Sequence, residues 1–320
     1  MKKQISIRGQ LNIKEKIRGQ ETLAIVIANY NGASDIELCL DSLAKSSFND
    51  FFVVIVDDCS ERNVADSIFI KNCQDKYPFR IEGVKTDKNL GFAGANNMGI
   101  KTALRYAPSY IMLLNNDTVI LEDAIEILVS RLNNSSKTIA SPKILYMDDD
   151  TKIWSAGGEF DDELKIPKNR GASEADTKKF DIEQECFYLS FCAVMMPAKI
   201  FEEIGMLSED YYMYSEDVDY CIRLRKQGYK LLYLPEAVIK HKGGASQVSS
   251  GSDSLYYSVR NECILREKYM DGGVTFNEKL LAKNKQKVIV KKMAHMDYSR
   301  NEKMVEAIEA WKRGERGKRV

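Results

Sequence analysis

The stretch from Tyr110 to Thr118, Tyr-Ile-Met-Leu-Leu-Asn-Asn-Asp-Thr, joins an apolar, β-prone run to side chains that can bind a metal ion. The run predicts a buried strand, which would place Asn115, Asn116 and Asp117 at the carboxyl edge of a sheet. Ligands bind at that edge in open α/β sheets. A carboxylate there can hold a divalent cation, and the cation can hold a diphosphate. An Asx-rich turn that only ends the strand is the alternative, and this segment alone does not decide between the two.

Two earlier apolar runs also end in polar side chains. Residues 23–28 and 52–56 are continuous β-prone segments, as expected of strands buried on both faces of a parallel sheet. A helical pattern follows each run, and strands that alternate with helices predict a parallel sheet with right-handed crossovers. A nucleotide site at the strand ends requires ligand-capable residues at these positions. The residues found there are Asn29, Asn31, Asp57 and Asp58.

A glycine-rich segment, Asn89 to Gly99, opens a helix predicted to end near Tyr106. Its glycines allow close approach to the backbone, and the helix N-terminus can face an anion. The positions of Gly91, Gly94 and Gly99 do not match the G-x-G-x-x-G spacing of a dinucleotide fingerprint, and the segment does not follow the first strand. Tight packing at a helix entry is the alternative interpretation.

Three carboxylates, Glu216, Asp217 and Asp219, open another predicted helix. The helix dipole favours acidic residues there, which is the purely structural explanation. A general base needs a partly desolvated carboxylate within reach of its proton, and Asp217 is a candidate. His241 is one of two histidines and is predicted to lie in a loop immediately after a strand at 229–234. A lone histidine is more often structural than a ligand, but this position favours ligation.

The composition excludes several classes of protein. Lys plus Arg and Asp plus Glu number 47 each, so no global field favours nucleic acid as a partner. Hydrophobic residues make up 44% of the 320 residues, which is ordinary for a globular protein. No apolar run approaches the roughly 20 residues of a membrane span. The first twenty residues lack the apolar core of a secretory signal, so we expect a cytoplasmic protein.

Six short motifs occur in order and together resemble a known family. They are Asn29-Tyr-Asn31, Val56-Asp-Asp58, Asn89-Leu-Gly-Phe-Ala-Gly-Ala-Asn-Asn97, Leu114-Asn-Asn-Asp-Thr118, Tyr214-Ser-Glu-Asp-Val-Asp219 and His241-Lys-Gly-Gly. This set is similar to family 2 inverting glycosyltransferases of the GT-A fold, in particular to the rhamnosyltransferase-like branch that builds bacterial polysaccharides. The resemblance spans about residues 22 to 270. A weaker match, Tyr257-Ser-Val-Arg-Asn261, corresponds to a Tyr and Arg-Asn pair usual in that branch.

The resemblance implies roles for individual residues. Asp217 would be the catalytic base, Asp117 would hold the last position of the metal-binding D-x-D motif, and His241 would complete the metal site. The cofactor would be Mg²⁺ or Mn²⁺. Residues expected to bind the donor are Asn29, Asn31, Asp57, Asp58, Asn89, Gly91, Phe92, Asn97, Asn116 and Arg260. Candidates on the acceptor side are Trp154, Gly158 and Glu216.

The chain departs from the family pattern at three places. The first D-x-D position is Asn115, so a cation would have one fewer charged ligand. Phe191 stands where the branch usually has glycine, and Leu207-Ser-Glu209 replaces the usual Phe-Asp-Glu. The last two changes fall in the acceptor half. The Q-x-x-R-W motif of processive synthases does not follow Asp219, which favours the addition of single sugars.

The resemblance also implies the organisation of the chain. We expect an α/β fold of GT-A type, in which a half with a mostly parallel sheet is fused to a mixed half. The predicted parts are a basic N-terminal extension (1–21), a nucleotide-sugar-binding half (22–118), an acceptor-binding and catalytic half (119–270) and a helical tail (271–320). Within the second half, residues 141–180 are expected to be irregular. The tail has an apolar stripe compatible with docking on the domain, on a second copy as a homodimer, or on a membrane.

The expected function is metal-dependent, inverting transfer of one sugar, such as rhamnose, from a UDP- or dTDP-sugar. The acceptor would be a growing, lipid-linked glycan at the cytoplasmic face of the membrane, which the chain would contact peripherally. One alternative is a nucleotidyltransferase, but residues 28–32 lack the basic phosphate loop that such an enzyme needs. Another is a degenerate domain that binds nucleotide or scaffolds a complex without catalysis. Asn115 and Phe191 favour that alternative, whereas Asp117, Asp217 and His241 count against it.

Overall fold

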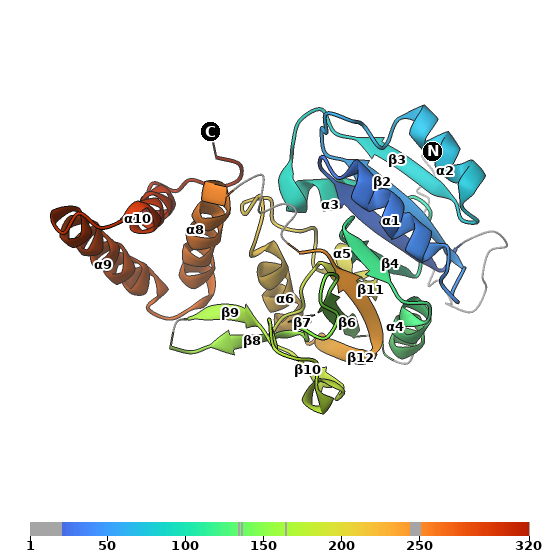
Figure 1. Cartoon of the computed structure of the whole chain (residues 1–320). Helices are drawn as coiled ribbons and strands as arrows, with labels where there is room; N and C mark the ends of the chain where they lie inside the picture. Colours follow the sequence, from blue (N-terminus) through green and yellow to red (C-terminus); the bar gives the residue numbers. More distant parts are fainter. Residues whose placement is uncertain (1–20, 134, 136, 164, 244–250, 320) are drawn as a thin grey trace, which may run out of the picture.

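A ten-stranded sheet forms the centre of the molecule (Figure 1). The computed structural model describes residues 21–133, 135, 137–163, 165–243 and 251–319. The predicted basic extension, apart from Glu21, therefore lies outside the described residues, as do residues 244–250. No helix in the described ranges is long and apolar enough to cross a membrane.

The first half of the sheet is parallel, with strand order β3-β2-β1-β4. Its strands are buried because helices cover both faces. Alternate residues of β1 point to opposite sides: Ile25 packs in the same cluster as residues of α1, and Val26 in the same cluster as residues of α3. The elements are β1 (Leu23–Asn29), α1 (Ala33–Leu43), β2 (Phe51–Asp57), α2 (Ser67–Lys76), β3 (Ile81–Lys85), α3 (Gly91–Leu104) and β4 (Tyr110–Leu114).

The strand order creates a crevice between β1 and β4. The chain builds β1, β2 and β3 in one direction and then returns to place β4 on the other side of β1. Ligands of open α/β sheets bind outside the carboxyl ends of the strands at such a reversal. The segments after Asn29 and after Leu114 therefore flank the predicted position of a ligand.

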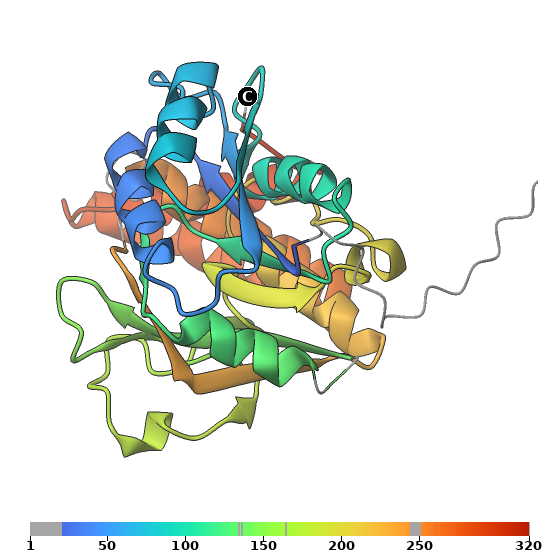
Figure 2. The same cartoon turned by 90° about the vertical axis from the view of Figure 1, so that its right-hand side faces the viewer.

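The second half of the sheet is mixed. β11 runs antiparallel to both β4 and β6, and β12 runs parallel to β6. In the turned view, α1 and α4 lie on one face of the sheet and the C-terminal helices on the other (Figure 2). The elements are β5 (Thr118–Ile120), α4 (Ala124–Asn133), β6 (Thr138–Tyr146), β7 (Ile153–Ser155), β8 (Gly158–Asp161), β9 (Ile166–Asn169), a 3₁₀ turn (Lys178–Phe180), β10 (Gln184–Glu185), β11 (Ala193–Pro197), α5 (Ile200–Glu203), α6 (Glu216–Lys226) and β12 (Lys230–His241).

Three predictions about local structure were wrong. Residues 141–180 are not irregular throughout, because β6 is a buried central strand that begins before them. Its Lys143 interrupts the apolar pattern, and the structure compensates the buried ammonium with Asp176 at 2.9 Å and Asp181 at 2.7 Å. His241 ends β12 and does not lie in a loop. Ser34 and Glu37 have the spacing of a capping box and predict a helix start at Ser34, but the box does not form, because Gly32 is the N-cap residue of α1.

Three C-terminal helices complete the chain: α8 (Gly251–Tyr269), α9 (Gly273–Met293) and α10 (Ser299–Lys312). They pack against one another, and α8 also packs on the body, where Tyr256, Cys263 and Ile264 join the same apolar cluster as α3. In Figure 1, α9 lies at the edge of the molecule farthest from the parallel half.

The turn before α6 has a strained backbone. Tyr212, Tyr214 and Ser215 have φ values of 66°, 68° and 74°, which residues other than glycine rarely adopt. The Asn261 side chain of α8 holds this turn by donating to three carbonyl oxygens. The acceptors are those of Tyr211, Met213 and Tyr214, at 2.8, 2.8 and 2.9 Å.

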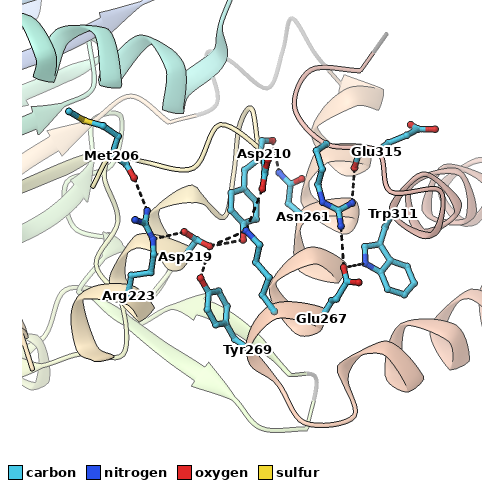
Figure 3. Close-up of polar contacts among 12 residues, drawn as sticks. Met206, Asp210, Asp219, Arg223, Asn261, Glu267, Tyr269, Trp311 and Glu315 are labelled. Carbon is cyan, nitrogen blue, oxygen red and sulfur yellow. Dashed lines mark hydrogen bonds and ion pairs between the residues drawn. The ribbon is translucent and has the colours of Figure 1, made fainter. Parts of the chain in front are cut away.

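Asp219 ties α6 to the same region (Figure 3). Its carboxylate is 2% exposed and accepts hydrogen bonds from the hydroxyls of Tyr211 at 3.0 Å and Tyr269 at 2.7 Å. Arg223 donates to the other oxygen at 3.0 Å and reaches the Met206 carbonyl at 2.9 Å. Of the three carboxylates that open α6, Asp219 thus has a structural role, and the start of the helix has a fixed position.

We expect Asn261→Ala to release the 210–215 turn. Three carbonyl oxygens lose their donor, which should reduce the free energy of unfolding by about 1–3 kcal/mol and should make the 210–215 amides exchange faster. Urea unfolding and hydrogen–deuterium exchange measure the two effects. Asn284→Ala is the matched control, because Asn284 is equally buried but bonds only within the C-terminal helices, to Leu280 and Asn301. Unchanged exchange at 210–215 in Asn261→Ala would contradict the assignment.

Candidate active site

Asp117 and His241 meet at the edge of the sheet although they are far apart in the chain. Asp117 lies between β4 and β5, and β5 pairs antiparallel with β12 so that Thr118 faces His241. The Asp117 Oδ1 and His241 Nε2 atoms are 3.0 Å apart, and both side chains are largely buried. The Asn115 side-chain amide is 3.5 Å from His241 Nε2. The Trp154 ring packs edge-on against the imidazole, with the two ring centroids 4.5 Å apart.

This pair fits two ligands of one divalent cation. Two neighbouring ligands of an octahedral Mg²⁺ ion lie about 3.0 Å apart, because each is about 2.1 Å from the metal. No group of three or more His, Cys, Asp or Glu side chains with metal-binding geometry occurs among the described residues. The protein therefore offers Asp117 and His241, and the remaining ligands would come from a diphosphate and water.

The pKa of His241 determines whether the Asp117–His241 pair carries a proton. Burial lowers the pKa of the imidazole, but Cys192 and the Asp117 carboxylate raise it more, to about 10. His241 is therefore protonated at neutral pH and forms an ion pair with the Asp117 carboxylate. The proton on Nε2 must leave before that nitrogen can ligate a metal. Nδ1 is buried and has no hydrogen-bond partner in the described part of the chain.

The crevice between β1 and β4 brings together Asn29 and Asn116. The Asn116 amide donates to the Asn29 Oδ1 atom at 2.7 Å. A Cβ atom at Gly32 would lie 2.2 Å from the same amide nitrogen, so only glycine fits there. Asn31, with a φ of 55°, donates its backbone N–H to the Ser60 hydroxyl at 2.9 Å and links the loops after β1 and β2. The adjacent Tyr30 ring is 54% exposed and is available to stack on a base.

Asp57 and Asp58 shape loops with their carboxylates. Asp57 is fully buried and accepts from the backbone N–H groups of Ser60 at 2.9 Å and Val64 at 3.1 Å. Asp58 accepts from the N–H groups of Leu90 at 2.8 Å and Gly91 at 2.9 Å. The entry of α3 is therefore capped by a carboxylate of the protein itself, which differs from the anion site expected there. Contact of either aspartate with a nucleoside remains a prediction.

The other residues of the glycine-rich segment pack against the turn before α6. Gly91 has a φ of 73°, and a Cβ atom there would lie 2.4 Å from the Tyr212 carbonyl oxygen. The Asn89 side chain accepts from the Tyr212 hydroxyl at 2.8 Å. Asn97 is buried and bonds to both backbone groups of Leu207, at 3.0 Å each. Phe92 is partly buried in the core beside α3. Their side chains thus connect the parallel half to the segment that delivers Asp217.

Asp217 and Glu216 form a pair of carboxyl groups at the start of α6. Burial raises the pKa of Asp217 to about 6, although the backbone N–H groups of Val218 and Phe191 donate to it and oppose the shift. Burial and the charge of Asp217 raise the pKa of Glu216 well above its usual value. The Glu216 Oε2 atom is buried without a hydrogen-bond partner among the described residues. Asp217 can thus exchange a proton near neutral pH, whereas burial and the neighbouring charge favour the protonated form of Glu216.

The other predicted site residues surround this arrangement. Trp154 contacts His241, as described above. Gly158 lies under the Tyr188 ring, which a Cβ atom would approach to 2.0 Å. Arg260 is fully buried and donates to the Tyr211 carbonyl at 3.2 Å, so in this structure it supports the turn before α6. Its role in donor binding remains a prediction.

Three residues near the site were not predicted from the sequence. Burial raises the pKa of the Tyr188 hydroxyl well above 10, and the nearby Asp217 carboxylate raises it further. Asn261 holds the turn before α6, and Ser60 links the β1 and β2 loops. Only Asn261 left a signal in the sequence, because it belongs to the weak Tyr257-Ser-Val-Arg-Asn261 match.

Solved structures similar to this chain show which fold it has. A mannosyltransferase from Pyrobaculum calidifontis in complex with GDP-Man and Mn²⁺ aligns with a TM-score of 0.56 over 92% of this chain and 87% of that one, at 13% identity. GalNAc-T7 with UDP, GalNAc and Mn²⁺ aligns with a TM-score of 0.58 over 81% and 55%, at 14% identity. These alignments confirm the predicted GT-A fold.

Curated relatives agree in sequence. The chain is 26% identical over 211 residues to the low-salt glycan biosynthesis hexosyltransferase Agl10 of Haloferax volcanii, covering 65% of this chain and 62% of Agl10. It is 23% identical to the dTDP-rhamnosyl transferase RfbF of Shigella flexneri, covering 57% and 61%. The chain thus spans less than two thirds of the length of these relatives.

The family model described as glycosyl transferase family 2 matches residues 24–205. This range includes the crevice between β1 and β4, Asp117 and Trp154, whereas Asp217 and His241 follow it. Because the match covers more than half of the 320 residues, the chain belongs to glycosyl transferase family 2.

Proposed function

We propose that this protein is a metal-dependent, inverting glycosyltransferase that moves a single sugar from a nucleotide sugar. The observation that carries the proposal is the convergence of Asp117 and His241 at 3.0 Å beside the crevice between β1 and β4. That position is where the fold class binds nucleotides. Family membership supports the choice of a sugar nucleotide as the ligand.

Asp117 and His241 would hold Mg²⁺ or Mn²⁺ against the diphosphate of the donor. When bound, the cation neutralises the charge that develops on the departing nucleoside diphosphate. Asn29, Asn31 and Asn116 line the crevice and would bind the nucleoside, together with the loops that Asp57 and Asp58 shape. Two structures of the same fold were determined with Mn²⁺ and a nucleotide or nucleotide sugar, which supports this choice of cofactor.

Asp217 would act as the general base. It would accept the proton of the acceptor hydroxyl while the hydroxyl oxygen attacks the anomeric carbon from the face opposite the leaving group. This single displacement inverts the anomeric centre. Burial prepares Asp217 for the task because a base with a pKa near 6 is ionised at neutral pH yet still accepts a proton readily.

We propose a UDP- or dTDP-sugar as donor and a growing, lipid-linked glycan at the cytoplasmic face of the membrane as acceptor. The similarity to RfbF, a dTDP-rhamnosyl transferase, supports deoxyhexose transfer in particular. A degenerate domain that binds nucleotide without catalysis is the second candidate, because Asn115 replaces a charged ligand of the D-x-D motif. Turnover by the purified chain separates the two.

Asp217→Asn should lower kcat by about 10²–10⁴-fold, the usual contribution of a general base, and should leave nucleotide affinity unchanged. Release of nucleoside diphosphate from a donor panel measures the rate. Glu216→Gln is the comparison variant, because it removes the neighbouring carboxyl group, and the acceptor-side role expected for Glu216 would raise KM more than it lowers kcat. Equal losses in the two variants would contradict the assignment of Asp217 as the base.

The rate should depend on pH through Asp217. Its raised pKa of about 6 means that the carboxyl group is protonated, and inactive as a base, below that value. At a Mn²⁺ concentration that saturates the site at every pH, so that the proton on His241 does not limit metal binding, we expect kcat/KM to fall about tenfold per pH unit below about pH 6 and to level off above about pH 7. A profile of the initial rates between about pH 5 and about pH 8 tests this. A flat profile over a range in which the protein stays folded would exclude the proposed base.

Asp117→Asn should weaken cation binding in the presence of a nucleoside diphosphate at least tenfold. A titration of Mn²⁺ monitored by electron paramagnetic resonance measures the free ion with and without UDP or dTDP. Asp219→Asn removes a more deeply buried carboxylate that bonds only to other groups of the protein, and it should keep cation affinity. If Asp117→Asn binds Mn²⁺ with nucleotide as tightly as the unaltered chain, the metal site lies elsewhere.

A further inference from the structure

Large apolar side chains are exposed together at the end of α9. Ile289, Val290 and Met293 are 59%, 56% and 79% exposed, and Met296 in the following turn is 58% exposed. Contiguous exposed apolar residues indicate a surface that another molecule covers. They contrast with Leu281 on the same helix, which is buried against the neighbouring helices.

The helix that carries these residues is strongly basic. It contains six lysines and one acidic residue, Glu278. Two of the lysines pair with α10, Lys285 with Glu309 at 2.6 Å and Lys292 with Glu302 at 3.4 Å. The lysines without an ion pair to any described residue are Lys279, Lys283, Lys287 and Lys291.

The spacing of these residues places the charges beside the apolar cluster. Lys279, Lys283 and Lys287 are four residues apart and therefore form one row on the helix surface, which Val290 extends. Ile289 and Met293 form the adjacent row. The buried residues of α9 lie on the opposite side and face α8 and α10. In Figure 1, α9 lies at the outer edge of the molecule, and the residues of both rows are exposed to solvent.

We infer that this outer face of α9, formed by Lys279, Lys283, Lys287, Ile289, Val290 and Met293, binds the surface of an anionic lipid bilayer. A helix that lies in a membrane interface inserts apolar side chains among the acyl chains and pairs a basic flank with anionic headgroups. The outer face of α9 combines these two features on one side of one helix.

A second copy of the chain and nucleic acid each fit the outer face of α9 less well than a bilayer does. A symmetric dimer through this face would bring the same surface of both copies together and oppose their lysines. Nucleic acid would pair with the lysines but would leave the apolar cluster uncovered. An anionic bilayer can pair its headgroups with the lysines and cover the apolar side chains with its acyl chains at the same time.

The inference gives a defined surface to the membrane contact proposed above. Bilayer binding needs neither donor nor turnover, so it can be lost while the proposed transferase function stands, and the reverse also holds.

The test is co-sedimentation of the full chain with vesicles of phosphatidylcholine alone and with an equimolar mixture of phosphatidylcholine and phosphatidylglycerol. We expect binding only to the anionic vesicles. The triple variant K279Q/K283Q/K287Q should reduce the partition coefficient roughly 100-fold, given the usual gain from each lysine near an anionic surface. I289S/V290S/M293S should also weaken binding and should lower in particular the part that persists at high salt.

The control K45Q/K71Q/K101Q removes the same charge from exposed lysines on the α/β body and should leave vesicle binding unchanged. All the substituted positions in these variants are solvent-accessible, so circular dichroism should show the native fold. Retained binding in both α9 variants, as attachment through the basic N-terminal residues would give, would overturn the inference. So would a dimer in analytical ultracentrifugation that I289S/V290S/M293S converts to monomer without any vesicle binding.

Discussion

The antiparallel pairing of β5 with β12 is the interaction on which the candidate site depends. It holds His241 opposite Thr118 and so brings the imidazole to Asp117. β12 has about twice the mean length of a strand, and its part after the register shift between Leu234 and Val238 pairs with β5. The pair that we propose as cation ligands thereby forms across the boundary between the two halves of the fold, beside the carboxyl ends of β1 and β4, where the strand order reverses.

The second element of the candidate site, the proposed base Asp217 on α6, is positioned by side chains at some distance from it. Asn97 from α3 holds Leu207, Asn261 from α8 holds the turn at 211–214, and Asp219 ties α6 to α8. Strained backbone at Tyr212, Tyr214 and Ser215 persists because these contacts determine it from both sides. The same burial that fixes Asp217 raises its pKa, so position and reactivity have one physical cause.

The sequence predicted the parallel half because its strands are uninterrupted apolar runs that end in polar residues, and the GT-A fold and the family were confirmed. The mixed half was less accessible. Ser141, Pro142 and Lys143 hide a buried strand, because the ion pairs that neutralise Lys143 come from residues more than thirty positions away. The extent of β12 was missed for a related reason, since the polar Glu236 and Lys240 interrupt the run before His241. The local sequence pattern also showed that Asp57 and Asp58 follow a strand. It could not show that backbone N–H groups donate hydrogen bonds to their carboxylate oxygens. The roles in donor binding, catalysis and acceptor binding remain predictions.

The central claim is that the crevice between β1 and β4 binds a nucleoside diphosphate through a cation held by Asp117 and His241. Thermal stability of the purified chain with UDP, dTDP, GDP or NAD, each with and without Mn²⁺, tests it most directly. UDP or dTDP should stabilise the folded chain only when the metal is present, by roughly 2.7 kcal/mol at about 100 times the dissociation constant. Stabilisation by NAD, or by no nucleotide even with Mn²⁺, would contradict it.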